Sequence, residues 1–367
     1  MGRARYARSP EAAGSRNGHR PRRVQTAEGE ITIAMPQVRD TLTRFVSSVI
    51  PDTRAIVRTR PLEALVIGAY VRGLSDRDIE SLAREAGLGT ISRTTVSGIC
   101  RELRDRYRAF RVRSLGEVHL LALFMDAIYL PVRPEGPKEG VLVAWGFTTD
   151  GVRVLLDVCL GQRERSEDWL DLGRGLIARG LRSPLLVVSD GAPGLIRAIS
   201  ELWPDADRGR CAVHRLRNVL AKLPKRPDLH ARVRAAYWAA LDEAISPQQA
   251  EHGLRVLVGE LSAEYPSAAA CLADDLPALS VHLAYPLRLK KRLRSTNLLE
   301  RSLEEVRRRT KVIGRFPGET SCLTMAWAVM DLVIAGSRGL GLTLPDRHAI
   351  AALIAARAVP QTAQQIA

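Results

Sequence analysis

The sequence predicts a mixed α/β fold of the α+β type, and three observations support this prediction. The chain has 367 residues, which is enough for two or three domains. Its central part, from about residue 118 to 214, contains short apolar runs that are typical of buried strands. On both sides of this part, apolar residues recur at helical spacing. We therefore expect a sheet-containing domain between helical segments.

The composition narrows the class of protein. The chain has no run of about 18 apolar residues, and its start lacks the hydrophobic block of a signal peptide. We therefore expect a cytoplasmic protein with no membrane partner. The five cysteines include no C-x-x-C pair, which argues against a disulfide framework and against a four-cysteine zinc site.

The charge of the chain is strongly positive. It carries 55 Lys and Arg against 40 Asp and Glu, a formal net charge of +15. The basic residues concentrate in two blocks, at 1–60 and 288–315. Such a chain commonly binds a polyanion, and two separated blocks favour nucleic acid held at more than one point. The alternative explanation is the arginine-rich composition of a GC-rich genome.

The N-terminal segment, 1–60, is expected to be basic and to contain a short β-hairpin. Residues 24–26 and 31–35 alternate in polarity on either side of a turn at 28–30. The first fifteen or so residues are expected to be disordered.

Residues 61–115 are expected to form a helix-turn-helix region. Apolar residues recur at helical spacing from Pro61, and Ser75 is a plausible N-cap for a second helix. Glycines at 87–89 break that helix, and another begins at Ser92. This layout is that of a DNA-binding motif, although helical hairpins also serve as packing units. The side chains expected to reach the major groove are Arg93, Thr94, Thr95, Ser97 and Arg101.

Residues 116–225 read as alternating strands and helices. Strands are expected at 118–125, 141–145, 152–156, 184–188 and 210–213, with helices at 166–179 and 194–202. Three strands that can pair antiparallel, followed by helix, strand, helix and strand, describe the first part of a ribonuclease-H-like core.

The remainder of the chain is expected to be helical. Residues 226–290, rich in Ala and Leu, predict an all-helical insertion. Residues 291–340 predict helices at 296–311 and 323–334 that complete the core, and 341–367 a helical tail.

Three carboxylates are candidates for chemistry. Asp126 and Asp190 are each expected to end a buried apolar strand, where an unpaired charge is costly and Mg²⁺ would suit a carboxylate pair. The alternative is that each Asp merely starts a turn. Glu300 shares a predicted helix face with Glu304, Arg307 and Lys311. Two interpretations are open: Glu300 forms ion pairs on the helix surface, or it binds a metal ion next to basic residues that contact the phosphates of DNA.

Five motifs in order carry a resemblance to a known family. They are LFMDAIY at 123–129, VVSDG at 187–191, RCAVHR at 210–215, STNLLER at 295–301 and EVRRRTKVIGRFP at 305–317. The chain closely resembles the Mutator-type transposases of bacterial insertion sequences, from about residue 14 to beyond 335. The last two motifs are far more specific than any bare spacing of acids.

The resemblance implies a DDE transposase. By motif position the triad is Asp126, Asp190 and Glu300, separated by 64 and 110 residues. Glu304 and Glu305 are alternatives for the third ligand, but neither occupies the Thr-Asn-x-x-Glu position. The implied cofactor is a pair of Mg²⁺ or Mn²⁺ ions, which would serve cleavage and strand transfer at the ends of the element.

The implied partners are the terminal inverted repeats of the element and target DNA. We expect a homo-oligomer on DNA and a nucleoid-associated location. A non-catalytic DNA-binding protein derived from a transposase is the alternative function, and a nuclease that cleaves without joining is a third.

Further residues are expected near the site. Cys211 and His214 match the family's C-x-x-H element; we expect Cys211 in a buried strand and His214 touching phosphate or orienting a carboxylate, with an ordinary core histidine as the alternative. Asn297 is a third near-site residue. The residues expected to follow the DNA backbone are Arg301, Arg307, Arg308 and Lys311.

Two features depart from the family pattern. Family members usually have more helical sequence before the RNGHRPR element at 16–22, and a Trp shortly before the cysteine, where this chain has Arg208-Gly209-Arg210. The first departure bears on end recognition and assembly.

Overall fold

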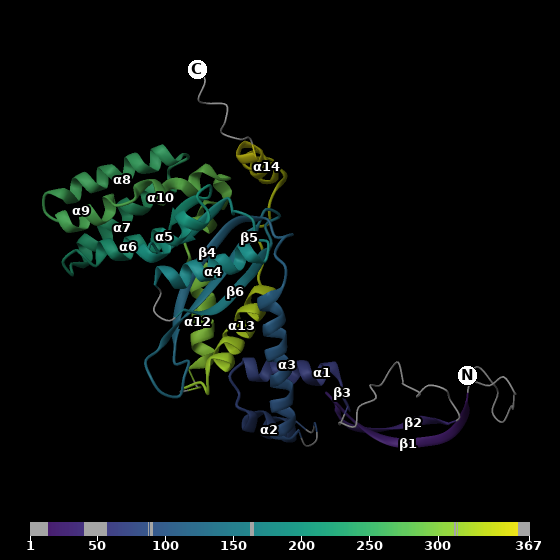
Figure 1. The fold of residues 1–367 in the computed structure, drawn as a ribbon. Coiled ribbons are helices and arrows are strands. Elements are labelled where there is room, and N and C mark those ends of the chain that lie inside the picture. The colour runs from purple at the N-terminus through teal and green to yellow at the C-terminus, as the bar shows by residue number, and fades with distance from the viewer. Residues whose placement is uncertain are drawn as a thin grey trace. The chain divides into compact units, whose positions relative to one another are not determined.

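The computed structural model describes residues 14–39, 57–86, 88, 91–161, 165–311, 313 and 315–358. The chain divides into two compact units, 1–105 and 106–367, which are described separately (Figure 1). Most of the N-terminal stretch that was expected to be disordered lies outside the described residues. Within the described part, none of the helices combines the length and apolarity needed to cross a membrane.

The first unit begins with the predicted hairpin, which is longer than its apolar pattern indicates. Strands β1 (Ser15–Thr26) and β2 (Gly29–Arg39) pair antiparallel, and the short β3 (Val57–Arg58) pairs parallel with β1. The turn lies at 27–28, where the Thr26 hydroxyl donates to the Gly29 carbonyl at 2.9 Å. The part of the hairpin that is rich in polar residues is largely exposed. It therefore lacks the alternation of apolar residues from which a strand can be predicted.

Three helices complete the first unit at the predicted places. They are α1 (Arg60–Val71), α2 (Asp76–Glu85) and α3 (Arg93–Val112), the last continuing into the second unit. Ser75 caps α2 as predicted, because the Asp78 amide donates to its hydroxyl at 3.2 Å and the Ser75 amide donates to the Asp78 carboxylate at 3.0 Å. Val96 and Ile99 of α3 are buried against the apolar faces of α1 and α2.

The second unit is built around a mixed five-stranded sheet, which confirms the predicted α+β class. Its order is β6-β5-β4-β7-β8, antiparallel from β6 to β4 and parallel from β4 to β8. The strands are β4 (Leu120–Leu130), β5 (Glu139–Thr148), β6 (Arg153–Gly161), β7 (Leu186–Ser189) and β8 (Asp207–Arg210).

Helices cover both faces of this sheet. Helices α4 (Ser166–Ala178) and α5 (Pro193–Leu202) bury Leu123 and Met125 of β4. Side chains alternate along a strand, so Phe124 and Asp126 face the other side. On that side Phe124 stacks on Trp145 with ring centroids 4.9 Å apart. Helices α12 (Asn297–Thr310) and α13 (Glu319–Ala335) pack on β4 and β6 respectively.

Two sequence predictions about the sheet are wrong. Strand β4 does not end at Asp126: it continues to Leu130, because β5 goes on pairing with it after β7 has ended. The fifth strand is Asp207–Arg210, not 210–213. The apolar residues after Cys211 form the buried start of α6 (Ala212–Leu220), and Cys211 is its N-cap rather than a strand residue.

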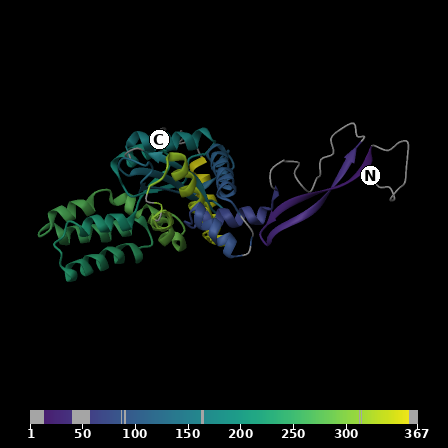
Figure 2. The same ribbon diagram turned by 90° about the horizontal axis from the view of Figure 1, so that it is seen from below.

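The expected insertion is a helical subdomain with its own core (Figure 2). Its helices are α7 (Pro227–Asp242), α8 (Pro247–Ser262), α9 (Pro266–Ala273) and α10 (Leu276–Ser280). The chain returns to the sheet through two 3₁₀ turns, Val281–Ala284 and Leu287–Leu289, and α11 (Lys290–Leu293). The helix α14 (Leu344–Ala358) lies in the predicted tail.

His282, at the exit of the insertion, should make stability depend on pH. Its side chain is 2% exposed, and burial, with the charges of Arg294 and Lys290, lowers its pKa to about 4. Because the unfolded chain binds this proton near pH 6.5, stability should fall as pH drops from about 6.5 toward 4. Between about pH 7 and pH 5 this residue should cost about 2 kcal/mol of unfolding free energy.

The measurement is urea unfolding of the wild type and of His282→Leu at both pH values. The variant should lose about 2 kcal/mol less than the wild type between them. Equal losses in the two proteins would show that His282 does not titrate on unfolding.

Candidate active site

The sheet places Asp126 and Asp190 side by side. Strands β4 and β7 pair in parallel register with Phe124 opposite Val188, and each aspartate lies two residues further along the chain. Asp190 directly follows β7, and its carboxylate accepts the Ala192 amide at 2.9 Å. The two predicted aspartates therefore meet near the centre of the sheet.

Glu300 reaches the same region from α12. Leu299, Leu303 and Val306 form the buried face of that helix, as the sequence predicted. Glu300 lies in the first turn, and its carboxylate accepts the Thr296 hydroxyl at 3.1 Å. Because α12 packs on β4, the third predicted carboxylate lies on the side of the sheet that Asp126 faces.

The pKa of Asp126 responds to both other carboxylates. It is raised to about 7, mainly by burial and less by the charges of Asp190 and Glu300, while the Ala127 amide and His214 oppose the rise. A site that concentrates like charges in poor contact with water is one that a cation stabilises. These carboxylate oxygens are the ligands that Mg²⁺ and Mn²⁺ prefer.

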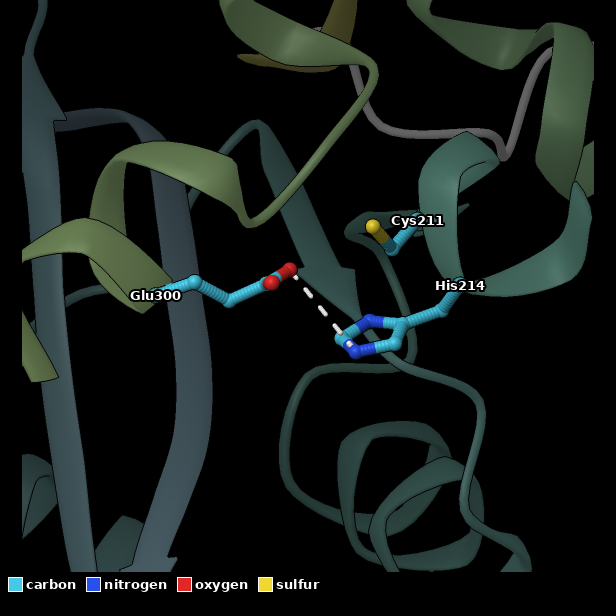
Figure 3. A group of neighbouring side chains, drawn as sticks. All are labelled: Cys211, His214 and Glu300. Atoms are coloured by element: carbon cyan, nitrogen blue, oxygen red, sulfur yellow. Dashed lines mark ion pairs between the residues drawn. The ribbon is translucent and has the colours of Figure 1, made fainter. Parts of the chain in front are cut away.

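Cys211 and His214 lie beside Glu300. Figure 3 shows Glu300 pointing toward His214, with Cys211 at the start of α6. His214 Nε2 is 3.7 Å from Glu300 Oε1, and one ligand atom of each of the three residues lies within 4.8 Å of the others. A zinc site built on Cys211 and His214 needs further ligands, which are commonly a second pair of Cys or His residues. In this structure the third neighbouring donor is the carboxylate of Glu300.

The Thr296 hydroxyl occupies the space between these donors. It lies 3.3 Å from Cys211 Sγ, 3.4 Å from His214 Nδ1 and 3.1 Å from Glu300 Oε1. Thr296 is fully buried, so this hydroxyl ties the start of α6 to the start of α12. Among the described residues, Cys211, His214 and Glu300 are the group of three or more possible metal ligands whose ligand atoms all lie within 4.8 Å of one another.

Cys211 and His214 change each other's ionisation. The hydrogen bond with Cys211, together with nearby negative charge, raises the pKa of His214 to about 9 despite burial. Burial opposes ionisation of the Cys211 thiol, but His214 and Thr296 outweigh it and lower the pKa of that thiol. The raised pKa favours the charged form of His214, whose Nε2 lies 3.7 Å from Glu300 Oε1.

Two further residues at the site, Arg217 and Thr296, were given no role in the sequence analysis. Arg217, one turn beyond His214 on α6, places a guanidinium nitrogen 3.7 Å from Glu300 Oε2 and is 62% exposed. Thr296 is the other. Their signal was spacing, since Arg217 follows His214 by three residues and Thr296 precedes Glu300 by four.

The remaining acids of α12 point elsewhere. Glu305 accepts two hydrogen bonds from Arg308, both 2.7 Å, and one from Arg309 at 2.6 Å. Glu304 is exposed. Neither alternative for the third ligand therefore competes with Glu300 in this arrangement.

The four residues in and just after α12 that were predicted to follow the DNA backbone are all exposed, whereas the predicted near-site residue Asn297 is not. Asn297, the first residue of the helix, is half-buried next to Thr296. Arg308 is exposed but paired with Glu305. The exposed residues of the set are Arg301, Arg307, Arg308 and Lys311.

In the first unit, the predicted recognition residues fall on the exposed side of α3. Thr94, Ser97 and Arg101 are exposed, opposite the buried Val96 and Ile99. Thr95 is half-buried, and its amide donates to the Ser92 hydroxyl at 3.2 Å. The side chain of Arg93 lies outside what the structure describes.

The match to known proteins now defines the class. The family model described as "Transposase, Mutator family" matches residues 1–333. The chain belongs to the Mutator family of transposases.

Individual relatives agree over most of the chain. A transposase for insertion sequence element ISRM5 of Rhizobium meliloti (strain 1021) is 34% identical over 336 residues, covering 90% of this chain and 81% of the relative. A transposase for IS1081 of Mycobacterium tuberculosis (strain ATCC 25618 / H37Rv) is 33% identical over 362 residues, covering 93% and 82%. A transposase for IS256 in transposon Tn4001 of Staphylococcus aureus is 29% identical over 330 residues, covering 89% and 83%.

The coupling between Cys211 and His214 can be measured directly. The His214 imidazole should titrate near pH 9 in the wild type, and Cys211→Ala should lower its midpoint toward about 6.5, because the thiol is its largest stabilising partner. NMR of protein labelled at histidine follows each titration. Cys322→Ala removes another buried cysteine, on α13, and should leave the midpoint unchanged. An unchanged midpoint in Cys211→Ala would refute the coupling.

Proposed function

We propose that this chain is a DNA transposase that cleaves and joins DNA at the ends of its own insertion sequence, using Asp126, Asp190 and Glu300. Family membership supports the transposase class. The observation that carries the catalytic proposal is the parallel register of β4 and β7, which brings Asp126 and Asp190 to neighbouring positions, together with the packing of the helix of Glu300 on β4. The charges of Asp190 and Glu300 both act on Asp126. The sheet order β6-β5-β4-β7-β8, with the first aspartate on the central strand, supports a ribonuclease-H-like core.

The three carboxylates would hold a pair of Mg²⁺ or Mn²⁺ ions. Such ions activate a water or a 3′-hydroxyl and stabilise the leaving oxygen at a phosphodiester. The contribution of the chain is to fix the three ligands before DNA arrives: strand pairing fixes the aspartates, and the packing of α12 together with Thr296 fixes Glu300. Preorganised ligands need no costly rearrangement during the reaction.

The side chains of His214 and Arg217 place positive charge next to the carboxylate of Glu300. Both lie 3.7 Å from its carboxylate. In this role His214 orients Glu300, and Arg217, with its exposed guanidinium, binds a phosphate next to the scissile bond. Arginine suits this contact because its planar fork can donate two hydrogen bonds to phosphate oxygens.

DNA would be held at two further places. The exposed cations of α12 (Arg301, Arg307 and Lys311) follow the backbone without reading sequence. In the first unit, Thr94, Ser97 and Arg101 present a polar face on α3, as a recognition helix would. We further propose that the DNA-bound protein is a homo-oligomer, so that both ends of the element are held together.

Removing a triad carboxylate should separate chemistry from binding. Asp190→Asn and Glu300→Gln should each abolish cleavage of end-containing DNA in Mg²⁺ or Mn²⁺, because each loses a charge that holds the ions. Affinity for DNA should stay the same or tighten as negative charge leaves the site.

The matched control is Glu304→Gln, the same change one turn further along α12 at an exposed position, which should keep wild-type cleavage. Cleavage is followed on end DNA with plasmid as target, and sequencing of junctions distinguishes joining from cleavage alone. Full activity of Asp190→Asn would remove the triad, and cleavage without junctions would identify a nuclease.

The recognition face should be separable from the backbone contacts. Thr94→Ala and Ser97→Ala should each reduce the preference for element ends over random duplex by about 1–3 kcal/mol, the usual value of a good base contact. The comparison variant, Arg307→Gln with Lys311→Gln, should weaken binding to every sequence and lower the salt slope by about 0.9 per lost phosphate contact. Binding assays at several salt concentrations measure both quantities. If the α3 variants lose affinity equally on both DNAs, that helix contacts only the backbone.

A further inference from the structure

The guanidinium of Arg210 lies flat against the backbone next to Asp190. Arg210 ends β8, opposite Ser189 of β7, and the Cys211 amide donates to the Ser189 carbonyl at 2.8 Å. A Cβ built on Gly191 would lie 2.2 Å from Arg210 Cζ and Nε, closer than any real contact. Gly191 also has φ of +91°, which disfavours other residues. The turn that carries Asp190 is thus shaped around the Arg210 side chain.

Arg210 is a buried charge with incomplete hydrogen bonding. Its side chain is 9% exposed, and within the described residues its Nε has no hydrogen-bond partner. Burial and the neighbouring charge of Arg215 lower its pKa. A buried guanidinium is costly unless opposite charges hold it, so its location depends on its acidic partners.

Those partners belong to the helical insertion. Asp274 and Asp275 lie between α9 and α10, and Arg210 NH1 is 3.3 Å from Asp274 and 3.8 Å from Asp275. Arg215 donates to Asp274 at 2.8 Å. Arg208 binds Asp275 through two nitrogens, one at 2.6 Å.

The backbone of Asp275 adopts an unfavourable conformation at this position. It has φ of +70°, and it is the one non-glycine residue with positive φ in the described part of the chain. This conformation is uncommon for an L-amino acid and persists where surrounding contacts enforce it. The two hydrogen bonds from Arg208 are the contacts that hold Asp275 in this conformation.

We propose that Arg210 is a positioning residue for Asp190, and that Asp274 and Asp275 of the insertion set its position. The guanidinium fixes the backbone at Gly191 and thereby the direction of the preceding carboxylate. A displacement of the insertion would act on Asp190 through this contact. The proposal rests on the function proposed above, because it takes Asp190 to be a metal ligand.

The test is the affinity of the DNA-free protein for Mn²⁺, followed by the electron paramagnetic resonance signal of free Mn²⁺. Arg210→Gln should weaken binding about tenfold, since a less restrained ligand loses preorganisation. Arg210→Lys keeps the charge but not the flat group over Gly191, and should not restore binding. Asp274→Asn, at a carboxylate that is 64% exposed, is the milder variant and should weaken binding several-fold. Asp228→Asn removes a charge from the same insertion, at an exposed pair with Arg226, and should change nothing.

Cleavage assays supply the second measurement. The Mg²⁺ concentration for half-maximal cleavage should rise in Arg210→Gln and Asp274→Asn, with recovery at saturating Mg²⁺ and unchanged DNA affinity. Wild-type Mn²⁺ affinity in both variants would overturn the proposal. If Arg210→Gln fails to fold, Asp274→Asn decides, and its wild-type behaviour would mean that the contact is only structural. Asp190→Asn separates the two proposals. If this variant keeps Mn²⁺ binding and cleavage, the proposed triad is wrong. If it loses both while the Arg210 and Asp274 variants behave as the wild type, only the positioning role is wrong.

Discussion

The burial of one carboxylate, Asp126, beside charged residues from segments 64 and 110 residues apart along the chain is the constraint on which the proposed site of the second unit depends. Burial is the main cause that raises the pKa of Asp126 to about 7, and the charges of Asp190 and Glu300 contribute less. Such a site forms only where the fold is stable enough to enforce it. Two apolar strands in parallel register fix the aspartates, and the apolar face of α12 on β4 fixes Glu300. The remaining charge is offset by His214 and Arg217.

The helical insertion enters the chain between the second and third carboxylates, and contacts with the core secure both its entry and its exit. At its entry, the Ala212 amide donates to the Arg294 carbonyl at 2.9 Å, and Cys211 meets Thr296 at 3.3 Å. Between α9 and α10, Asp275 binds Arg208 of β8, and Asp274 binds Arg215 of α6. These contacts join the helical insertion to the segments that carry Asp190 and Glu300.

Local features of the fold were predictable from the sequence, whereas long-range ones were not. The cap at Ser75, the helices and the apolar face of α12 follow from spacing within a few residues. The end of β4 depends on β5, which pairs past Asp126. The arginines of β8, Arg208 and Arg210, pair with the distant Asp274 and Asp275. The triad positions came from motif resemblance. Their convergence, and the roles of Thr296, Arg217 and Arg210, depend on contacts between residues far apart in sequence, which spacing alone does not specify.

The most direct test of this account is a crystal structure of the protein with end DNA and Mn²⁺, in which anomalous scattering locates the ions. The account predicts two peaks about 3.5–4 Å apart, ligated by Asp126, Asp190 and Glu300 beside the scissile phosphate. A single peak bound by Cys211, His214 and Glu300, with Asp126 and Asp190 unliganded, would contradict it.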